Sequence, residues 1–314
     1  MPAEPAYATM LHELIDHTLR DFVRGSRFAK EGAVVTDLDG TAVHEFEGHI
    51  VIPDAVSHSL KHLRDRGRPV ILNSLRFPLN VIRTFGREWY AISNAPLPLV
   101  SLNGGTIGHL VETREGEIAF EEIQAFPLTA TEIDEVLVGV QGLVDGGVDD
   151  LVLFYYPRDW TQGELIWTPA PDRLAEVRAK YLSATRVTSF PVETLRAELH
   201  AQQICMIFLL INAEEDRLMA YQHAKRSSFV THEGIDKLSG LEAMAGHLGL
   251  DLTHAVGAGD TPMDSFLKGI GLAVHVGDLD LEYKGLTGTV KVRDSLELGG
   301  LLTRLGHLLH GERH

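Results

Sequence analysis

The 314-residue sequence is poor in three features, and each shortage excludes a class of protein. Its one cysteine, Cys205, has no second cysteine to pair with, which excludes an internal disulfide framework. Its longest apolar run, ICMIFLLI at 204–211, is far shorter than the ~20 residues of a membrane-spanning helix. Positive charge is also scarce: 28 Lys and Arg against 44 Asp and Glu leave a formal net charge of −16, which opposes nonspecific binding to nucleic acid.

The lone cysteine favours a protein of a reducing compartment. The N-terminal residues lack the basic start, apolar segment and small-residue cleavage site of a secretory signal. We therefore expect a cytoplasmic protein that binds neither nucleic acid nor membrane and exists as a monomer or a homodimer. Cys205 could be a catalytic nucleophile, but its apolar neighbours Ile204 and Met206 favour a buried core residue.

The spacing of apolar residues predicts an α/β fold. Apolar residues at helical spacing between residues 8 and 28 predict an N-terminal helical extension over 1–30. It would pack on the body of the protein, the commoner outcome, or on another subunit. From Ala33 the pattern alternates between strands and helices, and this alternation resumes after residue 227. Such alternation is typical of a Rossmann-like parallel sheet with helices on its faces.

The middle of the chain interrupts this alternation. IGHLVE and EIAFEEI, joined by TREG, predict a hairpin, and Thr129 with Glu132 forms the capping box of a following helix. Because the parallel pattern returns later, this block is interpreted as an insertion between two halves of one sheet. We expect a Rossmann-like core over 31–106 and 227–314 and an inserted α/β unit over 107–226.

Polar residues follow three of the predicted core strands. They are Asp37 and Asp39 after the first strand, in VVTDLDGTAV, Ser74 and Arg76 after the second, and Asp260 and Asp264 after a later one, in GAGDTPMD. In open parallel sheets, ligands bind outside the carboxyl ends of the strands. We therefore expect these side chains to converge although they are far apart in the sequence.

Each of these patterns also has a structural explanation when it is taken alone. The Asp-Gly pair at 39–40 is a strong turn signal, and Asp260 could cap a following helix. Ser74 could be a turn hydroxyl, and Lys237 could be a solvated residue at a helix start. A calcium-binding EF-hand loop is a poorer alternative, because the residues after Asp39 lack its further ligands and its glycine.

Taken together and in this order, the motifs resemble those of the haloacid dehalogenase (HAD) superfamily of phosphohydrolases. The matching features are DxDGT at 37–41, Ser74 after the next strand, Lys237 before an apolar strand, and GDxxxD at 259–264. The insertion between the second and third motifs is similar to that of the subclass with a large α/β cap. That subclass includes Cof-type sugar phosphatases and the sucrose-, trehalose- and mannosyl-phosphoglycerate phosphatases. The resemblance covers about residues 31–310.

The resemblance implies a phosphoryl transfer in two steps. Asp37 would be the nucleophile that forms an aspartyl-phosphate, and Asp39 would act first as general acid and then as general base. Mg²⁺ would be held by the Asp37 side chain, the backbone carbonyl of Asp39 and Asp260, with Asp264 bound directly or through water. The implied phosphate-binding residues are Gly40, Ser74, Arg76 and Lys237.

The implied function is a Mg²⁺-dependent phosphatase whose partner is a small phosphate ester, with a sugar phosphate the favoured substrate. A phosphomutase on the same scaffold and a non-catalytic binding or regulatory protein remain alternatives. Two positions depart from the motifs: Leu75 stands where relatives often have Gly, and Met263 stands where they often have Asn. Neither change removes a charged residue, so we expect activity.

An aromatic segment of the insertion, LVLFYYPRDW, could contact a sugar. It contains Tyr155, Tyr156, Arg158 and Trp160, which offer stacking surfaces and a cation. The same residues could instead end a strand and form a surface turn, and we prefer this structural interpretation.

Overall fold

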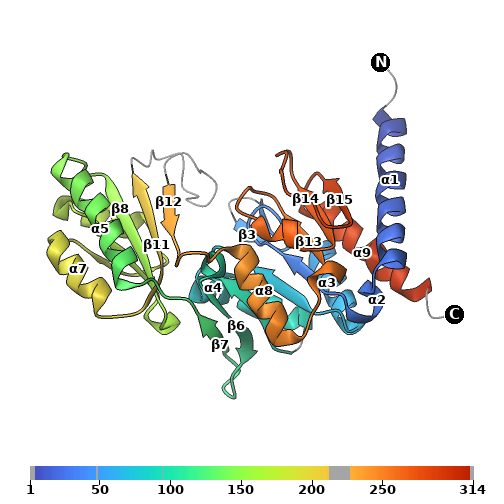
Figure 1. Cartoon of the computed structure of the whole chain (residues 1–314), viewed down its shortest axis with the longest axis horizontal. Coiled ribbons are helices and arrows are strands. Elements are labelled where there is room, and N and C mark those ends of the chain that lie inside the picture. Colours follow the sequence, from blue (N-terminus) through green and yellow to red (C-terminus); the bar gives the residue numbers. More distant parts are fainter. Residues whose placement is uncertain (1–3, 47–48, 94, 212–226, 312–314) are drawn as a thin grey trace.

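The computed structural model describes residues 4–46, 49–93, 95–211 and 227–311 of the chain. Figure 1 shows two α/β units side by side, each built around one large sheet. We call them the core and the cap. Within the described residues, each helix is too short or too polar to cross a membrane.

The core contains the Rossmann-like parallel sheet that the sequence predicts. Its strands are β1 (Val34–Thr36), β4 (Val70–Asn73), β5 (Leu97–Ser101), β6 (Thr106–Glu112), β7 (Ile118–Ala125), β13 (Val256–Gly259), β14 (Leu272–Val276) and β15 (Gly288–Val292). They lie in the order β15-β14-β13-β1-β4-β5-β6-β7. The strands from β15 to β5 are parallel, whereas β6 and β7 form an antiparallel hairpin at one edge.

Helices cover both faces of the core sheet, because its central strands are apolar on both sides. Val34 of β1 packs in a cluster with Leu60 and Leu302 on one face, and Val35 packs in a cluster with Leu241 on the other. The first face carries α1 (Glu4–Gly25), α3 (Asp54–Asp65), α4 (Pro78–Ser93) and α9 (Ser295–Gly311), and the second carries α8 (Lys237–Leu248) and the 3₁₀ helix η6 (Ser265–Gly269). Shorter elements of the core are α2 (Phe28–Glu31), β2 (His44–Phe46), β3 (His49–Val51), η1 (Leu102–Gly104) and η5 (Leu252–His254).

The N-terminal helix α1 packs on the core, as the sequence predicts. Its apolar residues Ile15, Leu19 and Phe22 are buried in the same cluster as residues of α9. An ion pair between Asp16 and Arg304, with 2.9 Å between Oδ1 and Nη1, joins the two helices at their exposed side. Figure 1 shows α1 at the end of the molecule that is far from the cap.

The cap is a mixed sheet whose two longer helices lie on one face. Its elements are α5 (Ala130–Asp145), β8 (Leu151–Pro157), η2 (Trp160–Gln162), β9 (Glu164–Trp167), η3 (Pro171–Arg173), α6 (Leu174–Lys180), β10 (Ala184–Thr188), α7 (Val192–His200), β11 (Ile204–Ile211) and β12 (Ser227–Val230). The strand order is β10-β9-β8-β11-β12. Leu137 of α5 and Leu195 of α7 pack against Tyr155 on one face of the sheet, whereas Phe154 and Phe208 lie on the other.

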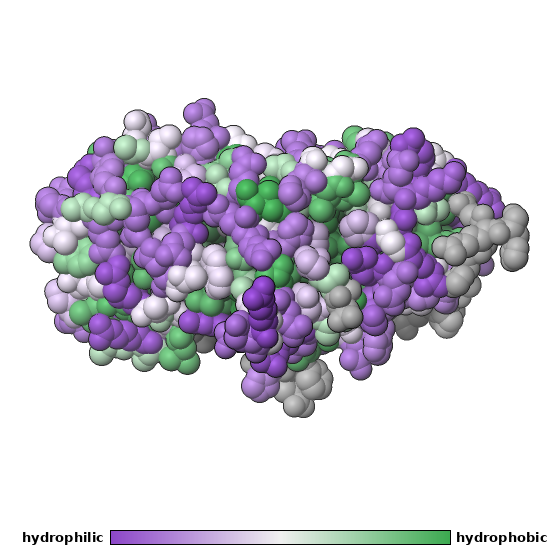
Figure 2. Space-filling model, turned by 90° about the horizontal axis from the view of Figure 1, so that it is seen from below, coloured by the Kyte–Doolittle hydropathy of each residue, from purple (hydrophilic) through white to green (hydrophobic). Residues whose placement is uncertain are grey.

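That second face of the cap sheet packs against the core. Phe154 and Phe208 share an apolar cluster with Leu75 and Phe77, which follow β4 of the core. The outer surface is different in character: on the face shown in Figure 2, hydrophilic residues predominate and hydrophobic residues form small groups between them. The apolar residues that join the two units are therefore buried between them and are not part of this outer face.

The sheet membership of two segments differs from the predicted boundaries of the insertion. The hairpin β6–β7 pairs with β5, so residues 106–125 extend the core sheet and do not belong to the cap. Strand β12 pairs with β11, so residues 227–230 belong to the cap sheet and not to the core. The predicted boundary at residue 226 itself lies outside the described residues. Hairpin and strand patterns show that strands exist, but they do not show which sheet receives them.

One carboxylate ties together the two chain segments that connect core and cap. The predicted capping box at the start of α5 is confirmed, because Thr129 and Glu132 bond each other's backbone N–H groups. Glu132 also accepts hydrogen bonds from the returning segment, from the His232 ring at 3.0 Å and the Glu233 N–H at 2.7 Å. Burial opposes ionisation of Glu132, but the hydrogen bonds from His232, Thr129 and Glu233 lower its pKa to about 2.

This arrangement predicts a pH-dependent contribution of Glu132 to stability. Its folded-state pKa is depressed, so the stabilisation is present above the ordinary pKa of 4.5 and is lost as the pH falls from 4.5 towards 2. We expect Glu132→Gln to lower the free energy of unfolding by about 1 kcal/mol at pH 7. Urea unfolding at pH 7 and at pH 4 measures whether this difference shrinks with acidity. Glu135→Gln, an exposed position on the same helix, is the control, and equal losses in both variants would contradict the role of Glu132.

Candidate active site

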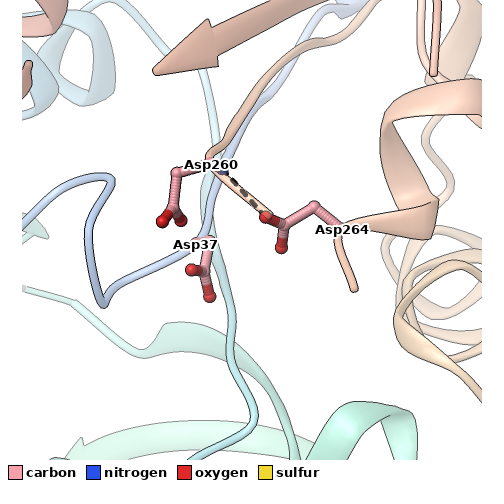
Figure 3. Close-up of side chains that lie close together, drawn as sticks. All are labelled: Asp37, Asp260 and Asp264. Atoms are coloured by element: carbon pink, nitrogen blue, oxygen red, sulfur yellow. Dashed lines mark hydrogen bonds between the residues drawn. The ribbon is translucent and has the colours of Figure 1, made fainter. Parts of the chain in front are cut away.

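Three carboxylates from the ends of two neighbouring strands meet at the carboxyl edge of the core sheet. Asp37 follows β1 and Asp260 follows β13, which are neighbours in the sheet with Thr36 opposite Ala258. Carboxylate oxygens of Asp37, Asp260 and Asp264 lie within 4.8 Å of one another. Figure 3 shows the carboxylates of Asp37 and Asp260 next to each other and that of Asp264 turned toward the backbone of Asp260. The expected convergence of these strand ends is present.

A buried lysine neutralises part of this negative charge. Lys237 is 2% exposed, and its Nζ lies 2.7 Å from Oδ1 of Asp37 and 2.7 Å from Oδ1 of Asp264. It is the first residue of α8, whose N-cap residue Asp236 accepts hydrogen bonds from the N–H groups of Leu238 and Ser239. Lys237 therefore does stand at a helix start, but the alternative that it is solvated is wrong.

Asp264 holds the loop after β13 in place, and the same loop carries Asp260. Oδ2 of Asp264 accepts hydrogen bonds from the backbone N–H groups of Asp260 and Thr261, both at 2.9 Å. Asp260 does not cap a helix, because the residues after it form turns up to η6. Its own Oδ1 accepts a hydrogen bond from the Thr41 hydroxyl at 2.8 Å. Thr41 thus fixes the orientation of Asp260.

Gly40 allows the first loop to approach the Asp260 side chain. Its φ of +75° lies in the left-handed region that disfavours other residues. A Cβ atom at this position would lie only 2.3 Å from Oδ2 of Asp260. The turn at Asp39 and Gly40 is therefore part of the site, because it brings the first loop against the Asp260 carboxylate.

The electrostatics of the cluster favour a cation beyond Lys237. Burial raises the pKa of Asp37 well above its ordinary range, and the nearby carboxylates raise it further against the opposing effect of Lys237. Burial and the charge of Asp264 raise the pKa of Asp260 to about 6. Burial would lower the pKa of Lys237, but the carboxylates of Asp264 and Asp37 raise it above its ordinary value. Carboxylates that stay close together despite burial and mutual repulsion are typical of a cation site.

The donor set fits a hard divalent cation. Asp37 and Asp260 offer carboxylate oxygens, the ligands that Mg²⁺ and Ca²⁺ prefer. Asp264 already receives hydrogen bonds on both oxygens, from Lys237 and from the backbone. Its geometry therefore suits a supporting role through water or backbone better than a full share in direct coordination.

The fourth predicted carboxylate, Asp39, is paired with Arg76. The guanidinium donates two hydrogen bonds, from Nε to Oδ2 and from Nη2 to Oδ1, each 2.7 Å long. The two side chains are 15% and 8% exposed, so solvent screens this bidentate pair only weakly. The sequence assigns Arg76 to the phosphoryl group, but in the structure its guanidinium holds Asp39.

Ser74 lies at the end of β4, beside the strand that leads to Asp37. It is buried, and its hydroxyl oxygen accepts a hydrogen bond from the Arg76 N–H at 3.1 Å. The turn-hydroxyl alternative is therefore present in the structure. A contact between Ser74 and a phosphoryl group stays a prediction.

Sequence reasoning missed one residue that positions Lys237. The Asn73 side chain donates a hydrogen bond from Nδ2 to the Lys237 carbonyl oxygen at 2.9 Å, which joins β4 to the start of α8. The signal was a buried amide at the end of the apolar strand VILN. Nothing in the spacing indicates its partner, which lies 164 positions away in the sequence.

The two motif departures have a shared structural reason. Leu75 is buried in the apolar cluster between core and cap, and Met263 packs against the same cluster. Both side chains therefore contribute contact surface toward the cap, where a glycine or an asparagine would contribute less.

The remaining residues that the sequence analysis considers lie in the cap. Cys205 is fully buried in the cap–core cluster, and burial raises its pKa to about 12, so the core-residue interpretation holds. Tyr155 packs beneath the cap helices, and Arg158 pairs with Glu122 of the hairpin. Tyr156, on the opposite face of β8, lines a pocket at the cap–core junction.

The sequence matches no protein-family model and no curated protein, so the comparison with solved structures carries the assignment of the fold. The chain is similar to BT1666 from Bacteroides thetaiotaomicron, a phosphatase of the HAD superfamily, with 15% identity, a TM-score of 0.62, and coverage of 89% of this chain and 96% of that one. It is also similar to BT4131, an HAD subclass IIB sugar phosphatase, with 14% identity, a TM-score of 0.61, and coverage of 88% and 98%. A haloacid dehalogenase-like hydrolase from Bacteroides thetaiotaomicron shares 18% identity at a TM-score of 0.59, with coverage of 88% and 98%. The chain has the HAD fold.

The acidic cluster predicts a specific response to Mg²⁺. Cation binding to the folded state should raise the melting temperature, by the equivalent of about 2.7 kcal/mol at a hundred times Kd. Asp260→Asn should leave the metal-free protein as stable or more stable, because it removes a buried like charge, yet it should at least halve the Mg²⁺-induced shift. Thermal melts with Mg²⁺ and with chelator measure both effects. Asp278→Asn, exposed on the same unit, is the control, and an undiminished shift in Asp260→Asn would contradict the metal site.

Proposed function

We propose that the protein is a Mg²⁺-dependent phosphatase that hydrolyses a small phosphomonoester, a sugar phosphate by preference, through an aspartyl-phosphate on Asp37. The observation that carries this proposal is the position of Asp37. One of its carboxylate oxygens bonds Lys237, and the side chain also lies beside Asp260 at an edge where the donor set fits a divalent cation. The names of similar solved structures, which include phosphatases and a sugar phosphatase, support the reaction class.

Asp37 is suited to nucleophilic attack on phosphorus. Its Oδ1 accepts the hydrogen bond from Lys237, and Oδ2 is the oxygen left for the attack. Bond formation from Oδ2 to phosphorus and cleavage of the phosphorus–oxygen bond of the ester split the hydrolysis into two displacements. Lys237 offsets negative charge on nucleophile and phosphoryl group together. A bound Mg²⁺ would supply further neutralisation of that charge.

Asp39 would move the protons of both steps. In a protonated form, with one of the two hydrogen bonds from Arg76 given up, Asp39 would give its proton to the departing ester oxygen in the first step; the carboxylate would then take a proton from the attacking water in the second. The two hydrogen bonds from Arg76 fix the carboxylate in one orientation. Arg76 therefore acts on the reaction as a positioning residue through Asp39.

The test is phosphate release from a panel of sugar phosphates and other phosphomonoesters, measured with Mg²⁺ and with chelator. We expect chelator-sensitive release by the wild type. Asp37→Asn should lower it by at least about a thousandfold, because the amide removes the nucleophile, while circular dichroism shows the fold intact. Near-normal hydrolysis by Asp37→Asn would sink the nucleophile assignment. Isomerised ester in place of free phosphate would favour a phosphomutase. If neither free phosphate nor isomerised ester forms, a non-catalytic binding protein is favoured.

The positioning role of Arg76 has its own expected outcome. Arg76→Lys keeps the charge but cannot make the bidentate pair, so we expect kcat to fall about 10- to 100-fold with a smaller change in KM. Steady-state kinetics on the preferred ester measure this split. Arg87→Lys, exposed on helix α4 that follows Arg76, is the control. A rise in KM with kcat unchanged would mean that Arg76 binds substrate and does not position Asp39.

A further inference from the structure

A pocket of about 240 Å³ lies at the junction of core and cap. The core contributes Arg76, which precedes α4, and residues from the first turns of α4. The cap contributes residues of β8, β9 and β11 and of the segment that begins at the end of α6. Its volume is below the range of about 300–1,000 Å³ that is common for drug-sized ligands, which indicates a small metabolite. A ligand here would touch both units at once.

The pocket wall contains a buried carboxylate. Glu164 is 2% exposed and accepts hydrogen bonds from neutral groups: the Tyr156 hydroxyl at 2.8 Å, the Ser183 hydroxyl at 2.9 Å and the Asn80 amide at 3.5 Å. A carboxylate has about four acceptor positions, and the contact with Asn80 is long, so acceptor capacity remains. Glu164 can therefore accept a further hydrogen bond from a ligand hydroxyl.

A second polar group in the wall lacks a partner. Asn80 is 6% exposed, and its Oδ1 has no hydrogen-bond partner among the described residues. A buried polar atom without a partner costs folding free energy, and such atoms in native structures call for a reason. A hydroxyl donor bound in the pocket, after a small shift of this amide, would supply the missing bond. Asn80 and Glu164 come from different units and face each other across the junction.

The wall also contains the cationic residues Arg83 and Lys180 and four aromatic residues. Phe154, Tyr156, Tyr181 and Phe208 line the pocket, and the rings of Phe154 and Tyr181 pack edge to face with centroids 4.9 Å apart. Burial raises the pKa of Tyr181 to about 12, so its hydroxyl stays neutral. Apolar ring faces beside hydrogen-bond acceptors match a polyhydroxylated ring, whose C–H faces are apolar and whose edges carry O–H donors.

Arg76 connects this pocket to the candidate active site. Its guanidinium lies 2.7 Å from the Asp39 carboxylate, and the residue also lines the pocket. A leaving group whose ester oxygen is protonated by Asp39 would therefore extend past Arg76 toward Glu164. We propose that Glu164 and Asn80 determine the specificity for the leaving group, by accepting hydrogen bonds from hydroxyls of a polyhydroxylated group of about monosaccharide size in this pocket. The proposal rests on the proposed phosphatase function.

The test is a cycle of one protein change and one substrate change. The wild type and Glu164→Gln are assayed on the preferred sugar phosphate of the panel and on its deoxy analogues, each of which lacks one hydroxyl. A site that bonds a hydroxyl through a charged acceptor should lose about 10- to 100-fold in kcat/KM on the deoxy analogue. In Glu164→Gln this loss should shrink to about threefold or less. Asn80→Ala gives a second cycle if Glu164→Gln does not fold, and Glu193→Gln, exposed on α7, is the control.

The same deoxy loss in Glu164→Gln and in Asn80→Ala as in the wild type would overturn the pocket assignment while leaving the phosphatase intact. If the wild type hydrolyses no ester, the proposed function fails, and the pocket is judged by binding alone. The probes are then unphosphorylated monosaccharides and sugar alcohols, with the melting temperature as readout. A shift that Glu164→Gln removes would support the pocket, and no shift with any probe, or a shift that Glu164→Gln retains, would overturn it.

Discussion

The candidate site depends on one buried cation. Lys237 lies between Asp37 and Asp264 at hydrogen-bond distance from both, and its own carbonyl is held by Asn73. Loss of one partner from a buried ion pair costs about 3–5 kcal/mol, because the remaining charge stays desolvated. The first residue of α8 therefore fixes the loops that follow β1 and β13 as one assembly. This assembly positions Asp37, the proposed nucleophile, and the same carboxylates form a cluster whose donor set fits a second cation.

The junction of core and cap is the second constraint on the site. Its apolar cluster contains Leu75 and Cys205, with Met263 packed against it, and Glu132 ties together the two segments that join the units. A pocket with one wall from each unit lies within this junction. Among the described residues no cap residue belongs to the carboxylate cluster, so groups on the cap would act on the chemistry through the pocket at the junction.

The sequence predicts the parts of this account that follow from local pattern. Alternating strands and helices indicate the parallel sheet, and the rule that ligands bind at the carboxyl ends of strands brings Asp37 and Asp260 together. Pairings between distant residues are different in kind. The bond from Arg76 to Asp39, the partner of Asn73, and the sheet that receives β6 and β7 depend on tertiary packing, which no periodicity reports. The Glu164 pocket is likewise invisible, since its walls are 84 positions apart in the chain.

The central claim is that Asp37 carries the phosphoryl group between the two displacements. Its most direct test is to mix the wild type with its preferred ester and Mg²⁺, quench in acid, and map the peptides by mass spectrometry. The account predicts one added phosphoryl group on the peptide that contains Asp37, lost again once the ester is consumed. Phosphate release at full rate with the phosphoryl group on another residue, or with none on Asp37 at any time, would contradict it.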